Sequence, residues 1–181
     1  CIRDRSCPGQ FTPLGRELFF SAYNEATGSA LWSTDGTPSG AQMIWQPSTD
    51  PEEGGMGRLV AMGGDLYTTV TVPIDVEQDE YEYELWQHSG QPGGELKVTN
   101  IPSWASEMFA SESLIFMSID APATGRELWR SDGTADGTYM EGDLFPGPEG
   151  SRPEDFFELD GKVYFIARDP LFNRELWSMP L

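Results

Sequence analysis

The sequence has little basic charge and no long apolar run. Its 181 residues include 11 Lys and Arg against 30 Asp and Glu, which gives a net charge of −19. A surface of this charge repels nucleic-acid phosphates and anionic bilayers, so we expect neither as a partner. No stretch approaches the roughly 20 apolar residues of a membrane-spanning helix, so we predict no such segment.

Histidine and cysteine are equally scarce, with one His and two Cys. A Ser-His-Asp triad would have to use His88, and this set is too small for a typical transition-metal site. The sequence also lacks a phosphate-binding loop and a dinucleotide fingerprint. We therefore predict no catalytic residue and no enzymatic activity.

The two cysteines, Cys1 and Cys7, leave three alternatives open. They form a disulfide, or Cys1 carries a lipid anchor and leaves Cys7 free, or both are free thiols. The first two alternatives predict an extracellular, periplasmic or bacterial cell-surface location. A disulfide also excludes an extended strand here, because such a strand holds the two Cα atoms about 20 Å apart.

A Leu-Trp pair occurs four times and divides the chain into repeats. Its tryptophans are Trp32, Trp86, Trp129 and Trp177. The tryptophans are 54, 43 and 48 residues apart. A repeat of this length is one supersecondary unit that buries its apolar face against its neighbours. In each repeat, short apolar and aromatic runs between Gly, Pro, Asn and Asp clusters predict strands, four in each of the first three repeats.

This pattern predicts an all-β, four-bladed propeller that forms a single domain. The expected blades cover residues of about 8–47, 48–100, 101–146 and 147–181. The last repeat shows only three strands, and residues 1–7 are expected to complete it and close the ring. The alternatives are an open arc and a fragment of a larger propeller.

The segment Glu127-Leu128-Trp129-Arg130-Ser131-Asp132-Gly133-Thr134 resembles the repeats of the bacterial ELWxxDGT proteins. Asp160–Phe165 is similar to the strand that follows in those repeats. The resemblance implies an exported, surface-associated protein with propeller-like blades. The second repeat departs from the pattern, with His88-Ser89-Gly90 in place of Asp-Gly-Thr.

The repeated residues are expected to be structural. The four tryptophans are predicted to pack between blades rather than stack on sugars. A carboxylate precedes the pair in three repeats, at Glu84, Glu127 and Glu175, and needs donors such as a preceding arginine or backbone amides. Asp35 and Asp132 are predicted to form turns through backbone amides.

Ligand binding is expected on the face of the propeller that carries the irregular loops. The candidate residues on that face are Tyr81, Trp104, Asp169 and Phe172. A second candidate is an acidic run with the oxygen ligands that Ca²⁺ prefers, in which a solvated loop is the alternative. That run contains Asp75, Glu77, Asp79 and Glu80.

These observations favour an exported, non-catalytic binding or scaffold module that contacts another protein at the cell surface. A carbohydrate-binding propeller, with or without Ca²⁺, is the first alternative. A glycoside hydrolase with a carboxylate pair is the second.

Overall fold

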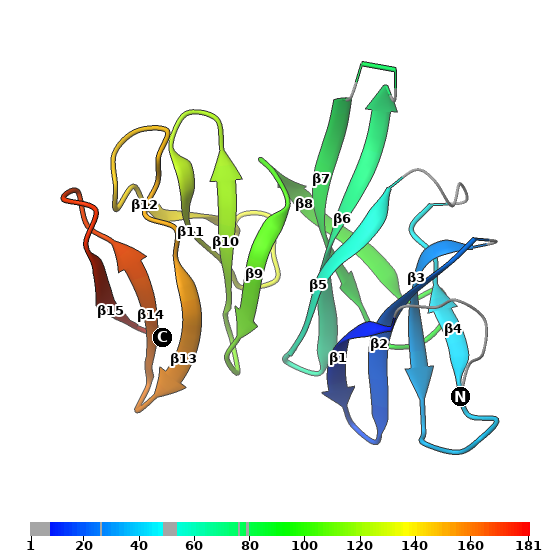
Figure 1. Ribbon diagram of the computed structural model, residues 1–181. Coiled ribbons are helices and arrows are strands. Elements are labelled where there is room, and N and C mark those ends of the chain that lie inside the picture. Colours follow the sequence, from blue (N-terminus) through cyan, green and yellow to red (C-terminus); the bar gives the residue numbers. More distant parts are fainter. Residues whose placement is uncertain (1–7, 26, 49–53, 76, 79) are drawn as a thin grey trace. The chain divides into compact units, whose positions relative to one another are not determined.

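The computed structural model describes residues 8–25, 27–48, 54–75, 77–78 and 80–181, and all regular elements in these ranges are strands (Figure 1). They form four antiparallel sheets, in which strands that follow one another in the chain are hydrogen-bonded. The all-β prediction is therefore confirmed. Among the described residues no helix is long and apolar enough to cross a membrane. The chain divides into two compact units, one ending at Ile101 and the other beginning at Pro102.

The N-terminal unit contains the first two sheets. The first consists of β1 (Gly9–Leu14), β2 (Glu17–Asn24), β3 (Gly28–Thr34) and β4 (Gln42–Trp45). The second consists of β5 (Gly55–Met62), β6 (Asp65–Asp75), β7 (Glu80–His88) and β8 (Glu95–Ile101). The β6–β7 hairpin is longer than the sequence predicts, because residues 73–75 and 80–82 continue the strands where a loop was expected.

The C-terminal unit contains the other two sheets. The third consists of β9 (Ala105–Ala110), β10 (Ile115–Ala121), β11 (Gly125–Ser131) and β12 (Tyr139–Gly142). The fourth consists of β13 (Glu154–Leu159), β14 (Lys162–Arg168) and β15 (Arg174–Pro180). This last sheet has three strands among the described residues. The predicted closing strand and both cysteines lie in residues 1–7, outside those ranges.

Within each unit, an apolar core joins the two sheets. In the N-terminal unit Leu31 of β3 lies in a cluster with Leu59 and Leu66 of the second sheet. In the C-terminal unit Leu128 of β11 lies in a cluster with Phe165 of the fourth sheet. The leucine of the repeated pair thus faces the following sheet, as the alternation of side chains along a strand requires.

The tryptophan of the pair faces the opposite way. Trp86 lies 5.1 Å from Trp45 of the preceding sheet, and Trp177 packs on the core shared with the third sheet. All four repeated tryptophans are only half-buried, whereas Leu31, Leu85 and Leu128 are 0%, 0% and 2% exposed. The smaller leucine thus fills the core, and the larger indole is partly exposed. That the indoles pack between blades stays a prediction.

The turn after the Leu-Trp strand has the same construction in two repeats. The carboxylate of Asp35 accepts from the backbone N–H (2.9 Å) and the hydroxyl of Thr37, and Asp132 accepts from Thr134 in the same way. These hydrogen bonds hold the pKa of both carboxyls below the usual value. The residue five positions on is glycine, and a Cβ on Gly137 would lie 1.9 Å from Asp132 Oδ1, so a larger residue would displace the capping carboxylate.

The second repeat builds this turn from other residues. His88 Nδ1 accepts from the backbone N–H of Gly90 at 2.9 Å, as the Ser131 hydroxyl does from Gly133 at 3.0 Å. Ser89 takes the place of the aspartate, and a Cβ on Gly94 would lie 1.9 Å from its hydroxyl oxygen. His88 is buried, and burial lowers its pKa, which favours the neutral imidazole that accepts the Gly90 hydrogen bond in this turn.

Candidate functional site

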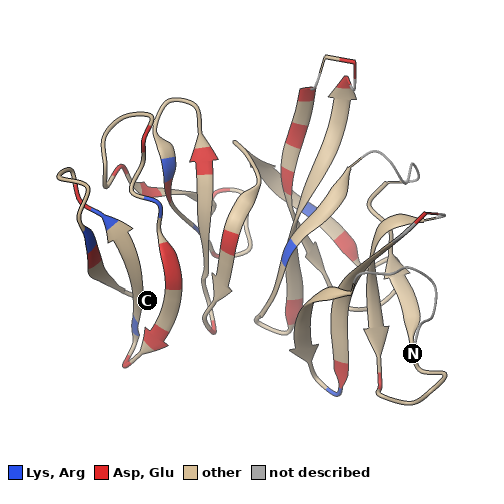
Figure 2. Ribbon diagram, in the orientation of Figure 1, with Lys and Arg blue, Asp and Glu red and all other residues tan. Residues whose placement is uncertain are grey.

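A polar cavity of about 360 Å³ lies in the C-terminal unit, between strands of the third and fourth sheets. We call it the arginine pocket, because arginine is its commonest residue. It is lined by Ser106, Glu107, Arg126, Arg152, Pro153, Glu154, Ile166, Ala167, Arg168 and Arg174. In Figure 2, several blue segments of this unit lie where β11 begins, where β14 ends and where β15 begins.

Backbone hydrogen bonds around Ser151 bring three of the arginines together. The N–H of Arg152 donates to the carbonyl of Arg126 at 2.9 Å, and the N–H of Arg168 donates to the carbonyl of Ser151 at 2.7 Å. Ser151 also donates its N–H to the Glu127 carboxylate at 2.9 Å, and its hydroxyl donates to the same group. One buried serine thus links β11 to the end of β14.

Two glycines allow this close approach. A Cβ on Gly125 would lie 2.5 Å from the carbonyl oxygen of Pro148, and one on Gly150 would lie 2.3 Å from the backbone nitrogen of Arg126. Both glycines have positive φ, at 68° and 63°. No other residue satisfies both the conformation and the contact.

Glu127 anchors the segment that leads into the pocket. It is fully buried and accepts from the backbone N–H of Phe145 at 3.1 Å and of Leu144 at 3.3 Å, besides Ser151. Burial raises its pKa, while the hydrogen bonds from Ser151 and the backbone act in the opposite direction. The donors are thus Ser151 and backbone amides, and the preceding Arg126 faces the pocket.

The positive charge of the pocket is only partly balanced from within. Arg168 and Arg174 are directly opposite each other on β14 and β15, a pairing of like charges that destabilises a sheet. Arg174 forms an ion pair with Glu154. Among the described residues no ion pair involves Arg126 or Arg168, and the buried Nε of Arg126 has no hydrogen-bond acceptor.

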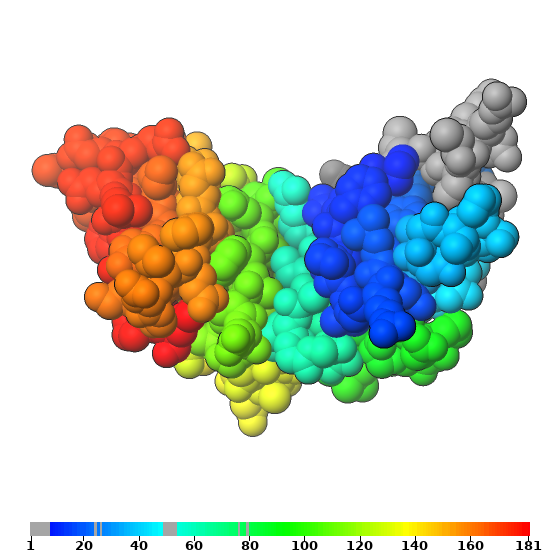
Figure 3. Space-filling view, turned by 90° about the horizontal axis from the view of Figure 1, so that it is seen from below, coloured from blue at the N-terminus to red at the C-terminus, as the bar shows by residue number. Residues whose placement is uncertain are grey.

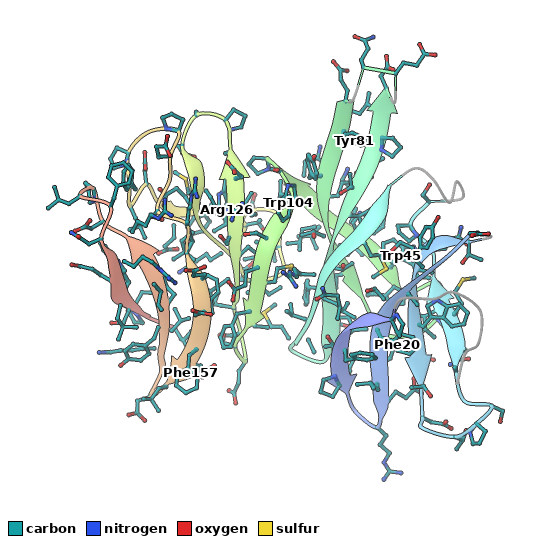
Figure 4. The ribbon with its side chains drawn as sticks, viewed as in Figure 1. Phe20, Trp45, Tyr81, Trp104, Arg126 and Phe157 are labelled. Carbon is teal, nitrogen blue, oxygen red and sulfur yellow. The ribbon has the colours of Figure 1, made fainter. Side chains whose placement is uncertain are left out.

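Trp104 adds an aromatic surface beside the pocket. Its side chain is 49% exposed, and the guanidinium of Arg126 lies 5.8 Å from its ring centroid (Figure 4). A cation over an indole face is an attractive contact. Trp104 therefore lies next to a pocket-lining arginine, on the loop side where ligand binding was expected.

Glu107 contributes a carboxylate to the same wall. It accepts from the backbone N–H of Asp155 at 3.2 Å. Burial raises its pKa; the hydrogen bond from Asp155 acts against this, and the nearby charges of Asp155 and Glu154 add to it. Asp155 itself and Arg152 have positive φ, at 57° and 54°, so strained backbone flanks the lining residues Pro153 and Glu154.

The other candidates for the ligand-binding face have different surroundings. Asp169 caps the β14–β15 turn by accepting from the N–H groups of Leu171 and Asn173, both at 2.8 Å, and the Asn173 side chain lowers its pKa. Phe172 is exposed in that turn, with its ring 4.9 Å from Phe145. Tyr81 belongs to β7 of the N-terminal unit and pairs with Pro73.

The acidic run occupies the tip of the β6–β7 hairpin. Asp75 accepts from the N–H groups of Glu77 and Gln78 and from the Gln78 side chain, and Glu80 begins β7. Asp79 lies outside the described residues. Within the described ranges no three His, Cys, Asp or Glu side chains are grouped so that they could hold a metal ion.

The remaining repeated carboxylates differ from one another. Glu84 is buried and accepts from the Trp86 indole at 2.7 Å and from Lys97. Glu175 is exposed on β15. The sequence therefore predicts the equivalent positions of the repeated glutamates in their strands. It does not predict that their hydrogen-bond donors differ.

Most of the arginine pocket was missed at the level of sequence. The sequence points only to Arg126 and Arg174, as the arginines that precede Glu127 and Glu175. One signal was present: both precede the Glu-Leu-Trp segment, so they begin equivalent strands in neighbouring repeats. Arg152 and Arg168 join them through the contacts of Ser151, which no local pattern reveals.

No family model matches the chain, and no curated protein matches it in sequence. Several solved structures resemble it. The apo AtxE2 isopeptidase has a TM-score of 0.56 at 10% identity, and the match covers 91% of this chain and 26% of the isopeptidase. The xylan β-1,4-xylosidase from Bacillus halodurans C-125 has a TM-score of 0.52 at 12% identity, covering 90% of this chain and 36% of its own. An exo-β-1,3-galactanase from Phanerochaete chrysosporium has a TM-score of 0.54 at 8% identity, and the match covers 90% of this chain and 43% of the galactanase.

The xylosidase and the galactanase are β-propeller glycoside hydrolases. At these identities the similarity concerns the fold alone, and it gives this chain a β-propeller-like all-β fold. The chain spans between 26% and 43% of the length of the three structures.

Proposed function

We propose that this protein is a non-catalytic, glycan-binding module of a propeller-type fold, exported to the cell surface, and that it binds through the arginine pocket. The observation that carries the proposal is a small, mostly polar cavity with the exposed Trp104 beside it. A cavity of about 360 Å³ lies in the size range of small-ligand sites, at its lower end. A cavity of this kind favours the carbohydrate alternative over a flat protein–protein contact.

The export proposal rests on other features. The resemblance to exported ELWxxDGT repeats and the strongly acidic composition both support it. Calcium assistance remains part of the proposal for the acidic run at the hairpin tip, which includes Asp79 outside the described residues.

A glycan array tests the function. The full chain should bind a defined subset of sugars, and a Trp104→Ala variant should lose most of that binding. Repeating the array with EDTA asks whether calcium contributes. Binding to no glycan, together with capture of a protein partner from the native envelope, would return the preference to a protein-binding scaffold.

We further propose that the four sheets are the four blades of one propeller. The fourth sheet, orange to red in Figure 3, supports this, because its last strand leaves the leucine of the repeated pair exposed. Leu176 is 72% exposed there, although it occupies the position that the following sheet covers at Leu31 and Leu128. An additional blade face would bury it in the same way.

A hydrolase is the second candidate, because Glu107 and Glu154 line one cavity. Both carboxylates already have structural partners. Glu107 accepts from the backbone N–H of Asp155, and Glu154 forms an ion pair with Arg174. We therefore favour binding over bond cleavage. Release of reducing sugar from an array-positive glycan, abolished by Glu107→Gln, would reverse this preference.

A further inference from the structure

The arginine pocket gathers basic residues of this acidic protein in one place. Four of the 11 basic residues of the chain line it, namely Arg126, Arg152, Arg168 and Arg174. With Glu107 and Glu154 both ionised, the lining carries 4 − 2 = +2, whereas the whole chain carries −19. A positive pocket on an acidic protein attracts an anionic group to one place.

The arginines lie close together although the described residues do not supply a carboxylate partner for each of them. Arg168 and Arg174 are opposite each other across two strands, and Glu154 neutralises only the second. Arg126 keeps a buried Nε–H without an acceptor. An anion in the pocket would supply acceptors to Arg126 and Arg168 and remove the repulsion between the opposed pair.

We propose that the arginine pocket binds the carboxylate of an acidic sugar, of the uronic acid class. The inference rests on the proposed glycan-binding function. The planar guanidinium offers two parallel N–H donors, which match the two oxygens of a carboxylate.

The rest of the lining favours a sugar over an acidic peptide. Ser106, Glu107 and Glu154 provide hydrogen-bonding groups for ring hydroxyls, and the exposed indole of Trp104 provides a flat surface for the next ring. The pocket is also too small for a long ligand. A dense polyanion would meet the repulsion of the whole chain, so a single acidic residue in a mostly neutral glycan fits best.

The test is a calorimetric titration of the full chain with methyl β-D-glucuronide, methyl β-D-glucoside and N-acetylglutamate. We expect the glucuronide to bind at least about tenfold more tightly than the other two. Arg168→Gln and Arg126→Gln should each weaken glucuronide binding at least about tenfold. Arg130→Gln is the matched control, because Arg130 lies on β11, pairs with Glu141 and does not line the pocket, so its effect should stay within about twofold.

Each outcome decides between the two levels of the proposal. Equal binding of glucuronide and glucoside overturns the inference but leaves glycan binding intact. Equal binding of N-acetylglutamate replaces the acidic sugar by an acidic peptide. Absence of glycoside binding, with an empty glycan array, overturns the proposed function as well. If a glutamine variant fails to fold, the ligand comparison on the native chain and the charge-conserving Arg168→Lys variant still decide, since lysine cannot form the two-pronged contact.

Discussion

At the residue scale, Glu127 has more structural consequences than any other member of the repeated motif. Its carboxylate accepts from the N–H groups of Leu144, Phe145 and Ser151 and from the Ser151 hydroxyl. These bonds hold the connection between β12 and β13, and Arg152 follows directly. The sequence predicts a structural glutamate here, whereas its effect on the pocket follows only from where the chain returns after β12.

Replacing Glu127 by Ala should destabilise the protein strongly. The backbone N–H groups of Leu144, Phe145 and Ser151 would lose their acceptor. Each unpaired buried group costs about 1–3 kcal/mol, so the free energy of unfolding in urea should fall by at least about 3 kcal/mol. Glu112→Ala, in the exposed β9–β10 turn, is the control and should change it by less than about 0.5 kcal/mol. Similar losses in the two variants would show that Glu127 anchors nothing.

Glu127 also predicts a pH dependence of stability. Burial raises its pKa in the folded state above the ordinary glutamate value, so the protonated form is favoured by folding. The resulting stabilisation is present below the unfolded pKa and is lost as pH rises through the folded pKa. The difference in unfolding free energy between the native chain and Glu127→Gln should therefore shrink as the pH rises above the ordinary glutamate range. A difference that grows over this range would contradict the sign of the shift.

At the scale of elements, the strands could be predicted well from the sequence. Apolar runs bounded by Gly, Pro, Asn and Asp locate strands because both signals are local. Two strand ends depend on tertiary or turn contacts. β12 ends at Gly142, since Leu144 donates its N–H to Glu127 instead of continuing the ladder. The β6–β7 strands continue into an acidic segment, where Asp75 caps the turn.

The turn after β11 allows a clean test of this local chemistry. Gly137→Ala would place a Cβ 1.9 Å from Asp132 Oδ1, which forces the capping carboxylate or the backbone to move. We expect a loss of about 1–3 kcal/mol in unfolding free energy. Gly142→Ala, at a position with no atom within 4 Å of the added Cβ, should be nearly neutral. Equal effects of the two alanines on thermal unfolding would refute the steric account.

At the scale of the whole molecule, the sequence predicts the repeats but not the site. Repeat spacing indicates a propeller-like fold because every repeat must bury the same faces. The arginine pocket depends on residues from five strands and one connection, which backbone contacts around Ser151 and the pairing of β14 with β15 bring together. The two units each contain a core of their own, so the assembly of all four blades is a separate question.

Leu176 provides the test of blade assembly. If another blade face covers it, Leu176→Glu should cost about 2–5 kcal/mol of unfolding free energy, as for a buried leucine that is lost. Leu171→Glu in the β14–β15 turn, where the side chain is 78% exposed, is the matched control. Equal and small effects would favour an open arc. A cost that appears only at high protein concentration would identify a second copy as the covering surface.

The most direct test of the central claim is a set of amide NMR spectra of the isotope-labelled full chain during addition of methyl β-D-glucuronide. The account predicts that the largest shifts fall on residues of the arginine pocket and Trp104, and that Arg168→Gln abolishes them. Shifts confined to the β6–β7 hairpin, or none at saturating ligand, would contradict it.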